Sequence, residues 1–225
     1  MIPSVSRSTV QPGQEAPDFL LPLVSEEGQI ALDDYRGRSP LILALLRSLW
    51  CPFCRRRVTQ LAETRQKLER AGVELLAVTE GRTEPLRKYF RMRPPRLRVA
   101  AGADPEAHIY RAYGVPMPAS TPEYKELRAT VRINPTGEAP EPMSLDAVQT
   151  WQREHDRFGQ IPEDQLDQLR SIRPDFNNIH AGHFLIDRAG VVRWVHIEAP
   201  IDDLSRYGIF PTDDELLAAL RAAGL

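Results

Sequence analysis

The arrangement of apolar positions along the chain predicts strands separated by helices. Leu41–Leu46 is a continuous apolar run, which is typical of a strand buried on both faces of a sheet. Val73–Val78 is a second apolar strand and Leu97–Ala100 is a shorter third one. A helical pattern that ends at a glycine joins the first two strands, a helix capped by Thr83 precedes the third, and a helix over Asp104–Tyr113 follows it. This order predicts right-handed crossovers and a parallel sheet.

Two antiparallel hairpins are expected outside this parallel part. Near the N-terminus, Asp18–Leu23 and Gln29–Leu32 flank a Glu-Gly turn. Near the C-terminus, His183–Ile186 and Val191–Ile197 flank a polar turn that ends in glycine. A last amphipathic helix follows over Thr212–Ala223. The whole pattern predicts an α/β fold, in which helices flank a central mixed sheet and a β-hairpin extends the N-terminus.

The segment Val115–Ile179 interrupts this alternation and is rich in proline and charge. Connections of this length inside a compact domain are often functional. We expect one domain over residues 1–225, with 115–179 as a mainly helical insertion containing helices at Leu145–Phe158 and Glu163–Leu169. The insertion is a lid over one end of the sheet, a dimer interface or a passive surface elaboration. Its apolar positions have helical spacing and need a surface to bury against: Leu145, Val148, Trp151, Leu166 and Leu169.

Composition narrows the classes of function. The 225 residues carry 29 basic and 31 acidic side chains, a net charge of −2, so nothing indicates a nucleic-acid-binding surface. Arginines cluster at Arg55–Arg57 and Arg87–Arg98, which we interpret as solvated helix surface. The longest apolar run is far shorter than the roughly 20 residues that span a bilayer. The polar segment Met1–Gln14 lacks the apolar stretch of a secretory signal, so we expect a cytoplasmic protein without nucleic-acid or membrane partners.

The only two cysteines, Cys51 and Cys54, follow the first buried strand. No cysteine remains for a structural disulfide, so the pair indicates redox or metal chemistry. Pro52 stands where a helix begins, which places Cys51 at a helix N-terminus, where unpaired N–H groups and the helix dipole stabilise a thiolate. Arg47 and Arg55–Arg57 add positive potential, and we expect a lowered pKa for Cys51. Cys54 is one helical turn away and within reach for an intramolecular disulfide.

Metal binding uses the same CxxC spacing and is the alternative. His180 and His183 begin the late hairpin, and we expect them near the strand ends where Cys51 lies. They can act as acid or base, complete a Cys2His2 metal site, or simply be satisfied by backbone groups. Trp50 is expected to pack over the dithiol. A binding module whose CxxC holds a metal or docks a redox partner therefore stays open beside an enzyme that needs no metal or other cofactor.

The dithiol segment and four flanking pieces carry a family resemblance: Leu41–Leu61, Gly13–Phe19, Leu32–Gly37, Ala103–Val115 and Phe184–Val192. Through these segments the chain resembles the peroxiredoxin-like branch of the alkyl hydroperoxide reductase/thiol-specific antioxidant (AhpC/TSA) family. The resemblance implies a thioredoxin-like fold with an N-terminal extension, to which a binding module whose CxxC holds a metal or docks a redox partner would also belong. It leaves the insertion unexplained.

Several positions depart from the family's pattern. Typical members have a Pro-x-x-x-Thr/Ser-x-x-Cys active site; with Cys51 as the attacking thiol, Ser48 takes the hydroxyl position but Ala44 replaces the proline. The family's active-site arginine sits just before the late strand, where this chain has His180–His183 and no arginine. Earlier in the chain, the segment at Arg128 resembles the strand start that carries the family's arginine. It is the candidate counterpart of that strand start. The thioredoxin-type cis-proline before the late strand is also missing.

The sequence thus predicts a thiol-disulfide oxidoreductase, as a peroxiredoxin-like peroxidase in which Cys51 attacks a peroxide or disulfide and Cys54 resolves it. The substrate would be a small peroxide or disulfide. The reductant would be a thioredoxin-like protein or a low-molecular-weight thiol, and a homodimer stays open. The expected supporting residues are Arg47, Ser48, Trp50 and Pro52, with His180, His183 and Arg128 around the pocket.

Overall fold

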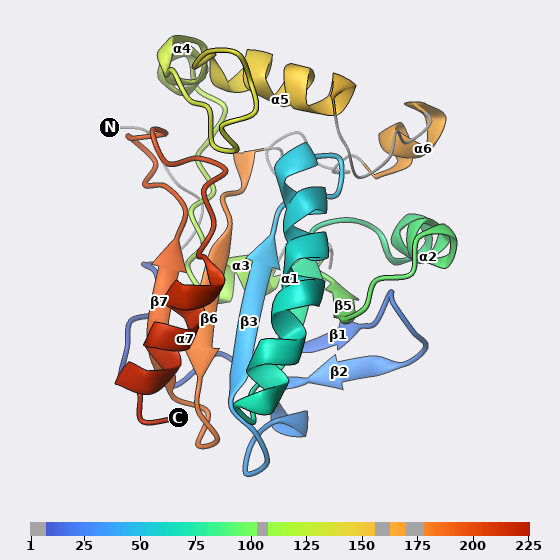
Figure 1. Ribbon diagram of the computed structural model, residues 1–225, viewed down its shortest axis with the longest axis vertical. Coiled ribbons are helices and arrows are strands. Elements are labelled where there is room, and N and C mark those ends of the chain that lie inside the picture. Colours follow the sequence, from blue (N-terminus) through green and yellow to red (C-terminus); the bar gives the residue numbers. More distant parts are fainter. Residues whose placement is uncertain (1–7, 103–107, 156–162, 170–177) are drawn as a thin grey trace.

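A five-stranded mixed sheet forms the centre of the computed structural model, which describes residues 8–102, 108–155, 163–169 and 178–225 (Figure 1). The strand order is β5-β4-β3-β6-β7. β3, β4 and β5 are parallel, β6 is antiparallel to β3, and β7 is antiparallel to β6, so that β7 points the same way as β3. The expected mixed sheet is confirmed. The strands span Leu41–Leu46 (β3), Glu74–Thr79 (β4), Arg98–Ala101 (β5), Gly182–Ile186 (β6) and Val192–Ile197 (β7).

The central strand β3 is apolar throughout because both faces of the sheet are covered. Ile42, Ala44 and Leu46 point into one hydrophobic core, and the alternate residues Leu41, Leu43 and Leu45 point into a second one on the opposite face. All six side chains are fully buried. Strands covered on both sides lose the polar alternation of a half-exposed strand, which is why the sequence shows an unbroken apolar run.

Helices α1 (Pro52–Arg70) and α7 (Asp213–Ala222) cover one face of the sheet, and α3 (His108–Ala112) lies on the other (Figure 1). Helix α2 (Thr83–Met92) contributes to the first core beside β5. The predicted cap at Thr83 is wrong, because Thr83 is the first residue of α2 and follows the N-cap Arg82. The start expected at Asp104 lies outside the described residues.

A short hairpin packs beside the main sheet, as predicted. It is formed by β1 (Leu20–Pro22) and β2 (Gln29–Ala31), which pair antiparallel, and a 3-10 turn follows at Leu32–Asp34. The hairpin contributes Leu21 and Ile30 to the second core, and α3 contributes Ile109 and Tyr110. No helix in the described part of the chain is both long and apolar enough to cross a membrane.

The insertion contains α4 (Pro122–Thr130), α5 (Leu145–Glu154) and α6 (Glu163–Gln168). Sequence reasoning missed α4, although Thr121 caps it and Pro122 opens it, because few of its residues are apolar. The end expected for α5 at Phe158 lies outside the described residues. Helices α4 and α5 lie beyond the N-terminal end of α1 in Figure 1.

The apolar stripe of the insertion is used within the chain. Leu145, Val148 and Leu169 are buried in the same core as α1 and α7, and Trp151 packs against that core. Leu145, Val148 and Leu169 are therefore not available to a second copy, whereas Trp151 and Leu166 are half-exposed. The homodimer itself stays a prediction.

Candidate active site

Cys51 lies at the edge of the sheet where the parallel strands end. It is the N-cap of α1, with extended φ and ψ of −74° and 120°, and Pro52 is the first helical residue. The Cys51 N–H donates to the carbonyl of Ser48 at 3.0 Å, which closes a tight turn after β3. The Arg55 guanidinium donates to the carbonyls of Leu49 and Trp50 at 2.9 and 3.2 Å and holds this turn from the helix side. The structure thus has the dithiol at a strand–helix junction, as the sequence predicts.

The two thiols are close, buried and differently ionised. Cys51 is 5% exposed and Cys54 is fully buried. Burial alone would raise the pKa of Cys51, but the hydrogen bond from the Cys54 thiol and the charge of Arg47 lower this pKa well below its ordinary value. Burial and the same thiol–thiol hydrogen bond raise the pKa of Cys54 well above its ordinary value. Cys51 is therefore the thiol that ionises more easily, and its thiolate is stabilised by the hydrogen bond from the Cys54 thiol.

Arg47 supplies the positive charge at the thiolate. Its Nε–H donates to Sγ of Cys51 at 3.4 Å, and its backbone carbonyl accepts from the Thr79 hydroxyl at 2.9 Å. The guanidinium is buried and lies over the Tyr207 ring, 4.1 Å from the ring centroid. The Nη2 atom has no hydrogen-bond partner among the described residues. A buried arginine thus contacts the Cys51 sulfur from the end of β3, while the pattern of the family places the arginine before the late strand.

The counter-ion of Arg47 is Glu198. Its Oε1 atom pairs with Nη1 of Arg47 and accepts from the N–H of Ala181 at 2.9 Å, and its Oε2 atom accepts from the N–H of Gly208 at 3.0 Å. A buried ion pair is favourable only when its remaining hydrogen-bonding groups are satisfied. The two backbone donors do this for the carboxylate, so Glu198 fixes the arginine in place.

His180 joins the site through an aromatic neighbour. Its Nδ1–H donates to the carbonyl of Ala199 at 2.8 Å, so Nε2 accepts from the Tyr124 hydroxyl at 3.1 Å. The ring packs edge-on against Tyr207. Burial lowers the pKa of His180 to about 4, so the imidazole is neutral at neutral pH.

Three other expected site residues, His183, Arg128 and Trp50, have contacts with side chains other than the two cysteines. His183 accepts from Nε of Arg57 at 3.2 Å, on the α1 side of the sheet. Arg128 belongs to helix α4, not to a strand start, and pairs with Asp146 of α5, so the expected strand at this position is wrong. Trp50 is half-buried, and the guanidinium of Arg153 from α5 lies 4.2 Å from its ring centroid.

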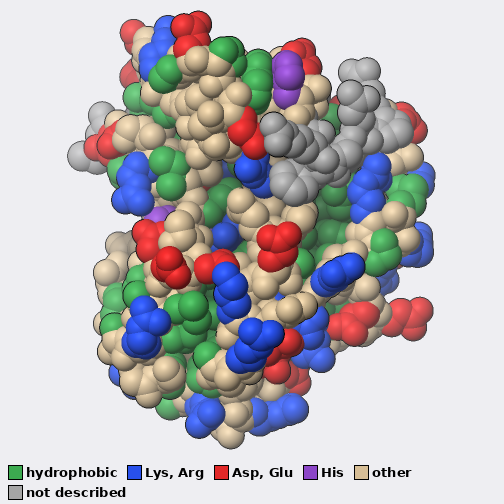
Figure 2. Space-filling model, viewed as in Figure 1, with side chains coloured by type: hydrophobic (Ala, Val, Ile, Leu, Met, Phe, Trp, Pro, Cys, Tyr) green, Lys and Arg blue, Asp and Glu red, His purple; other side chains and the backbone are tan. Residues whose placement is uncertain are grey.

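The arginine cluster after the dithiol is not solvated surface. Arg55 and Arg57 are buried, and only Arg56 of the three is partly exposed. The expectation failed because these residues occupy the first two turns of α1, where the helix is enclosed by the segments after β7 and by the insertion. Figure 2 shows basic and acidic side chains mixed over the face in view, without a continuous basic surface.

The metal-binding alternative gains no support from the side-chain positions. Among the residues that the structure describes, no three His, Cys, Asp or Glu side chains come close enough to hold a metal ion. Both ring nitrogens of His180 and Nε2 of His183 are already engaged by protein groups.

Glu198 and Tyr207 were missed by sequence reasoning, although the signal for Glu198 is present. β7 points the same way as β3, so the residue after each strand reaches the same sheet edge. Arg47 follows β3 directly and Glu198 follows β7 directly. A charged residue directly after each of two strands that point the same way predicts such a pair once the strand directions are known. Tyr207 lies in an irregular segment and carries no comparable signal.

Comparison with solved structures identifies the architecture. A peroxiredoxin-like protein from Aquifex aeolicus aligns with a TM-score of 0.56 at 15% identity, covering 99% of this chain and 92% of that one. A thiol peroxidase from Chromobacterium violaceum aligns at 0.54 and 15%, covering 100% and 93%. A protein from Chlorobium tepidum described as a thiol:disulfide interchange protein DsbE aligns at 0.52 and 21%, covering 96% and 99%. At these identities the likeness shows the fold alone, and it confirms the thioredoxin-like fold.

Sequence comparison adds the family. No curated protein matches the chain. The model of the AhpC/TSA family matches residues 12–139, which include the N-terminal hairpin, β3, the dithiol, Arg47 and the strands β4 and β5. The matched stretch exceeds half of the chain and contains the Cys51 site, and the resemblance seen in the motifs is confirmed: the chain belongs to the AhpC/TSA family.

Proposed function

We propose that the protein is a thiol-dependent peroxidase in which Cys51 attacks a small hydroperoxide and Cys54 resolves the product. The observation that carries this proposal is the contact of the Arg47 guanidinium with the Cys51 thiolate. It combines an ionised nucleophile with a buried hydrogen-bond donor, Nη2, that has no partner in the described structure. Peroxide reduction needs both, because negative charge develops on the leaving oxygen.

In the first step, the Cys51 sulfur attacks the terminal oxygen of the hydroperoxide. The S–O bond forms while the O–O bond breaks, and the leaving alkoxide takes a proton from solvent water and departs as an alcohol, or as water when the substrate is hydrogen peroxide. Cys51 becomes a sulfenic acid. The positive charge of Arg47 stabilises the departing oxygen, and Glu198 keeps the guanidinium oriented.

In the second step, Cys54 attacks Sγ of Cys51. The S–S bond forms, the S–O bond breaks, and the hydroxide leaves as water with the proton of Cys54. The negative charge on Cys51 is one of the factors that raise the pKa of Cys54. Sulfenic acid formation removes that charge, so oxidation of the first thiol makes the second one easier to ionise.

The cycle closes when a thiol reductant opens the Cys51–Cys54 disulfide. The reductant would be a thioredoxin-like protein or a low-molecular-weight thiol, in keeping with the cytoplasmic location expected from the sequence, where such thiols are kept reduced. The electrons from two reductant thiols return both cysteines to the starting state. No metal or organic cofactor takes part in this scheme.

Stopped-flow oxidation of the reduced protein by hydrogen peroxide tests the proposal. We expect a second-order step that disappears in Cys51→Ser. Cys54→Ser should keep this step and accumulate a sulfenic acid that a dimedone adduct reveals by mass spectrometry. Wild-type oxidation as slow as that of a free thiol such as N-acetylcysteine would contradict the peroxidase proposal.

Disulfide exchange with another protein is the second candidate, because a CxxC at a helix N-terminus also suits this reaction. The low exposure of Cys51 argues for the smaller substrate, since a protein disulfide reaches the sulfur only after local opening. Measuring insulin reduction and peroxide consumption with the same protein sample compares disulfide exchange with peroxide reduction. Rapid insulin reduction without peroxide consumption would favour this second function.

A further inference from the structure

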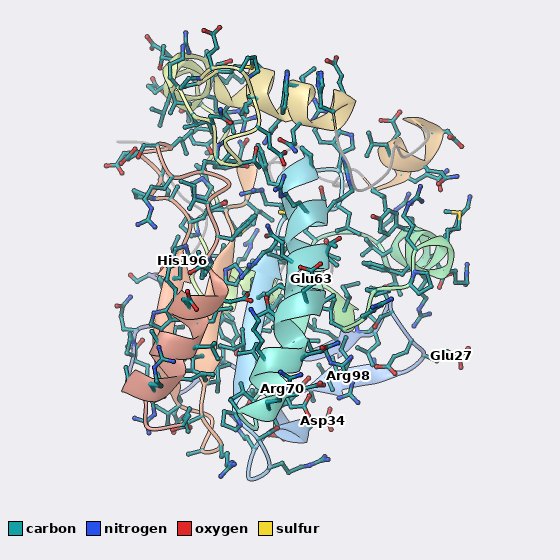
Figure 3. The ribbon with its side chains drawn as sticks, in the orientation of Figure 1. Glu27, Asp34, Glu63, Arg70, Arg98 and His196 are labelled. Carbon is teal, nitrogen blue, oxygen red and sulfur yellow. The ribbon has the colours of Figure 1, made fainter. Side chains whose placement is uncertain are left out.

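A cavity of about 440 Å³ opens between α1 and the segment 208–213 that leads into α7, and Phe53, which stands between the two cysteines in the chain, lines it. It is separated from the Arg47 site by one aromatic ring. The Phe210 centroid lies 5.9 Å from Cζ of Arg47 and 5.6 Å from Cζ of Arg57, which lines the cavity. Figure 3 labels Glu63 on α1, at the exposed rim of the cavity, and His196 on β7, behind α7.

The side chain of Arg57 is buried without a counter-ion. It is 3% exposed, and its Nε–H donates to the neutral ring of His183 at 3.2 Å. Its Nη2 atom is buried and has no hydrogen-bond partner, and no carboxylate in the described part of the chain lies within ion-pair distance. Burial lowers the pKa of Arg57 to about 10, and the more distant charges of Asp213 and Glu215 only partly oppose this.

Two of the neighbouring charges at the cavity, Arg56 and Asp213, are already paired, and the carboxylate of Glu63 is exposed at the rim. Arg56 forms an ion pair with Glu138 at 2.6 Å. Asp213 accepts from Nζ of Lys67 and from the Thr64 hydroxyl, both at 2.5 Å. Among the described residues that line the buried part of this cavity, Arg57 is therefore the charged side chain that lacks a counter-ion.

An uncompensated buried cation destabilises a protein unless something else neutralises it. Such destabilising arrangements are typical of binding sites, where the ligand completes the pairing. The walls around Arg57 are partly apolar, being formed by Phe53, Pro135 and Phe210. A guanidinium with apolar walls suits an organic carboxylate, which takes two parallel N–H donors and places its carbon chain against the rings.

We propose that this cavity is a subsite for the carboxylate of a small organic molecule that reacts at the dithiol. The reaction of this molecule at the dithiol rests on the proposed function, whereas anion binding at Arg57 does not. The cavity is far larger than a hydroperoxide group needs and falls in the usual range of small-ligand pockets. The carboxylate can belong to an organic hydroperoxide or to the reducing thiol.

Binding is tested on the reduced full-length protein with succinate and with its uncharged analogue dimethyl succinate. We expect succinate to raise the unfolding midpoint in a concentration-dependent way and the ester to have no such effect. Arg57→Gln should weaken succinate binding about tenfold or more, because it removes a charged hydrogen bond. Arg70→Gln, on the exposed C-terminal turn of the same helix, is the matched control and should bind like wild type.

The stability of the variant separates a ligand site from a structural arginine. Without anion, Arg57→Gln should unfold at the same or a higher midpoint than wild type, since it removes an uncompensated charge. A structural arginine would give a lower midpoint. If Arg57→Gln does not fold, Arg57→Lys keeps the charge and should bind succinate less tightly than wild type. A wild-type protein that shows no stabilisation by succinate, or a folded Arg57→Gln that binds it equally well, overturns the proposal.

Two kinetic comparisons identify the molecule that brings the carboxylate. Oxidation of Cys51 is followed with hydrogen peroxide and with a carboxylate-bearing alkyl hydroperoxide, and reduction of the disulfide with glutathione and with cysteamine, which has no carboxylate. In the half-reaction that uses the subsite, Arg57→Gln should slow only the carboxylate-bearing reagent. If Arg57→Gln changes the rates with both reagents equally in both half-reactions, the cavity does not bind the carboxylate of a reacting molecule. If neither half-reaction occurs while succinate still binds through Arg57, the peroxidase proposal fails and the anion site stands.

Discussion

The Nε–H of Arg47 reaches Sγ of Cys51 at 3.4 Å, across the turn that joins β3 to α1, while Nη1 of the same guanidinium pairs with Glu198. One planar group thus bridges the attacking sulfur and a fully buried carboxylate from the end of β7. The arrangement makes the ionisation of Cys51, the position of the arginine and the stability of the sheet edge depend on one another.

Arg47→Lys should slow peroxide reduction more than it changes folding. A lysine keeps the positive charge but lacks the planar fork that contacts Cys51 and Glu198 together. We expect the second-order rate with hydrogen peroxide to fall about ten- to hundredfold, which corresponds to about 1.4–2.7 kcal/mol of transition-state stabilisation. Stopped-flow kinetics measure the rate and urea unfolding measures stability. A rate within twofold of wild type would contradict the role given to the guanidinium fork.

Glu198→Gln should destabilise the fold far more than Glu138→Gln. The first change leaves the buried Arg47 without its counter-ion, and breaking a buried pair costs about 3–5 kcal/mol. Glu138 pairs with Arg56 at a partly exposed position, where an ion pair contributes about 1 kcal/mol or less. The free energies of unfolding in urea give both values. Similar losses in the two variants would show that Glu198 is no more important than an ordinary surface partner.

The pH dependence of alkylation should report the thiol pair. Because the pKa of Cys51 is lowered, iodoacetamide should react with it rapidly well below the ordinary cysteine pKa of about 8.5, while Cys54 reacts slowly. Cys54→Ala removes the hydrogen-bond donor and should move the profile of Cys51 to higher pH. Cys54→Ser keeps a donor and should move it less. Coincident profiles for the two variants would exclude the thiol–thiol hydrogen bond as a cause.

The same ionisation links stability to pH. The lowered pKa of Cys51 contributes stability that is complete above the unfolded value of about 8.5 and is lost as the pH falls through the folded value.

Acid should destabilise the protein partly through His180. Its pKa of about 4 in the folded state lies below the ordinary value of 6.5, so the unfolded chain binds the proton first as the pH falls. Stability should fall between about pH 6.5 and pH 4, with a share of about 2 kcal/mol from this residue at pH 4.5. His180→Asn retains a donor toward Ala199 and should reduce the loss between pH 7 and pH 4.5 in urea unfolding. An unchanged loss would contradict the assignment.

Helix α5 is expected to act as a lid, through the contact of Arg153 with Trp50 next to Cys51. Arg153→Gln should loosen this contact and raise the reactivity of Cys51 with a bulky aromatic disulfide more than with hydrogen peroxide. Deletion of residues 140–172 with a Gly-Ser bridge should have a larger effect of the same sign, provided that near-ultraviolet circular dichroism shows a folded protein. Unchanged selectivity in both folded variants would leave the insertion without a gating role.

The strands and the dithiol were predictable because their signals are local. The unbroken apolar run at Leu41–Leu46 and the proline after Cys51 fix a buried strand followed by a helix N-terminus. The partner of Arg47 was not predictable in this way, since Glu198 is brought to it by the direction of β7, a property of the whole sheet. The burial of Arg57 was missed for a related reason, because the segment that covers it, around Phe210, is irregular and distant in sequence.

Because Cys54 is fully buried and Cys51 is slightly exposed, the two thiols of the proposed cycle exchange bonds in a fixed order. An outside thiol or disulfide can bond only to Cys51, so a mixed disulfide with a partner always forms at that sulfur. Cys54 then acts as an internal release group, which attacks Cys51 and expels the partner. The depth of one sulfur atom thereby sets the order in which bonds are exchanged, and it keeps any partner attached only as long as Cys54 stays protonated.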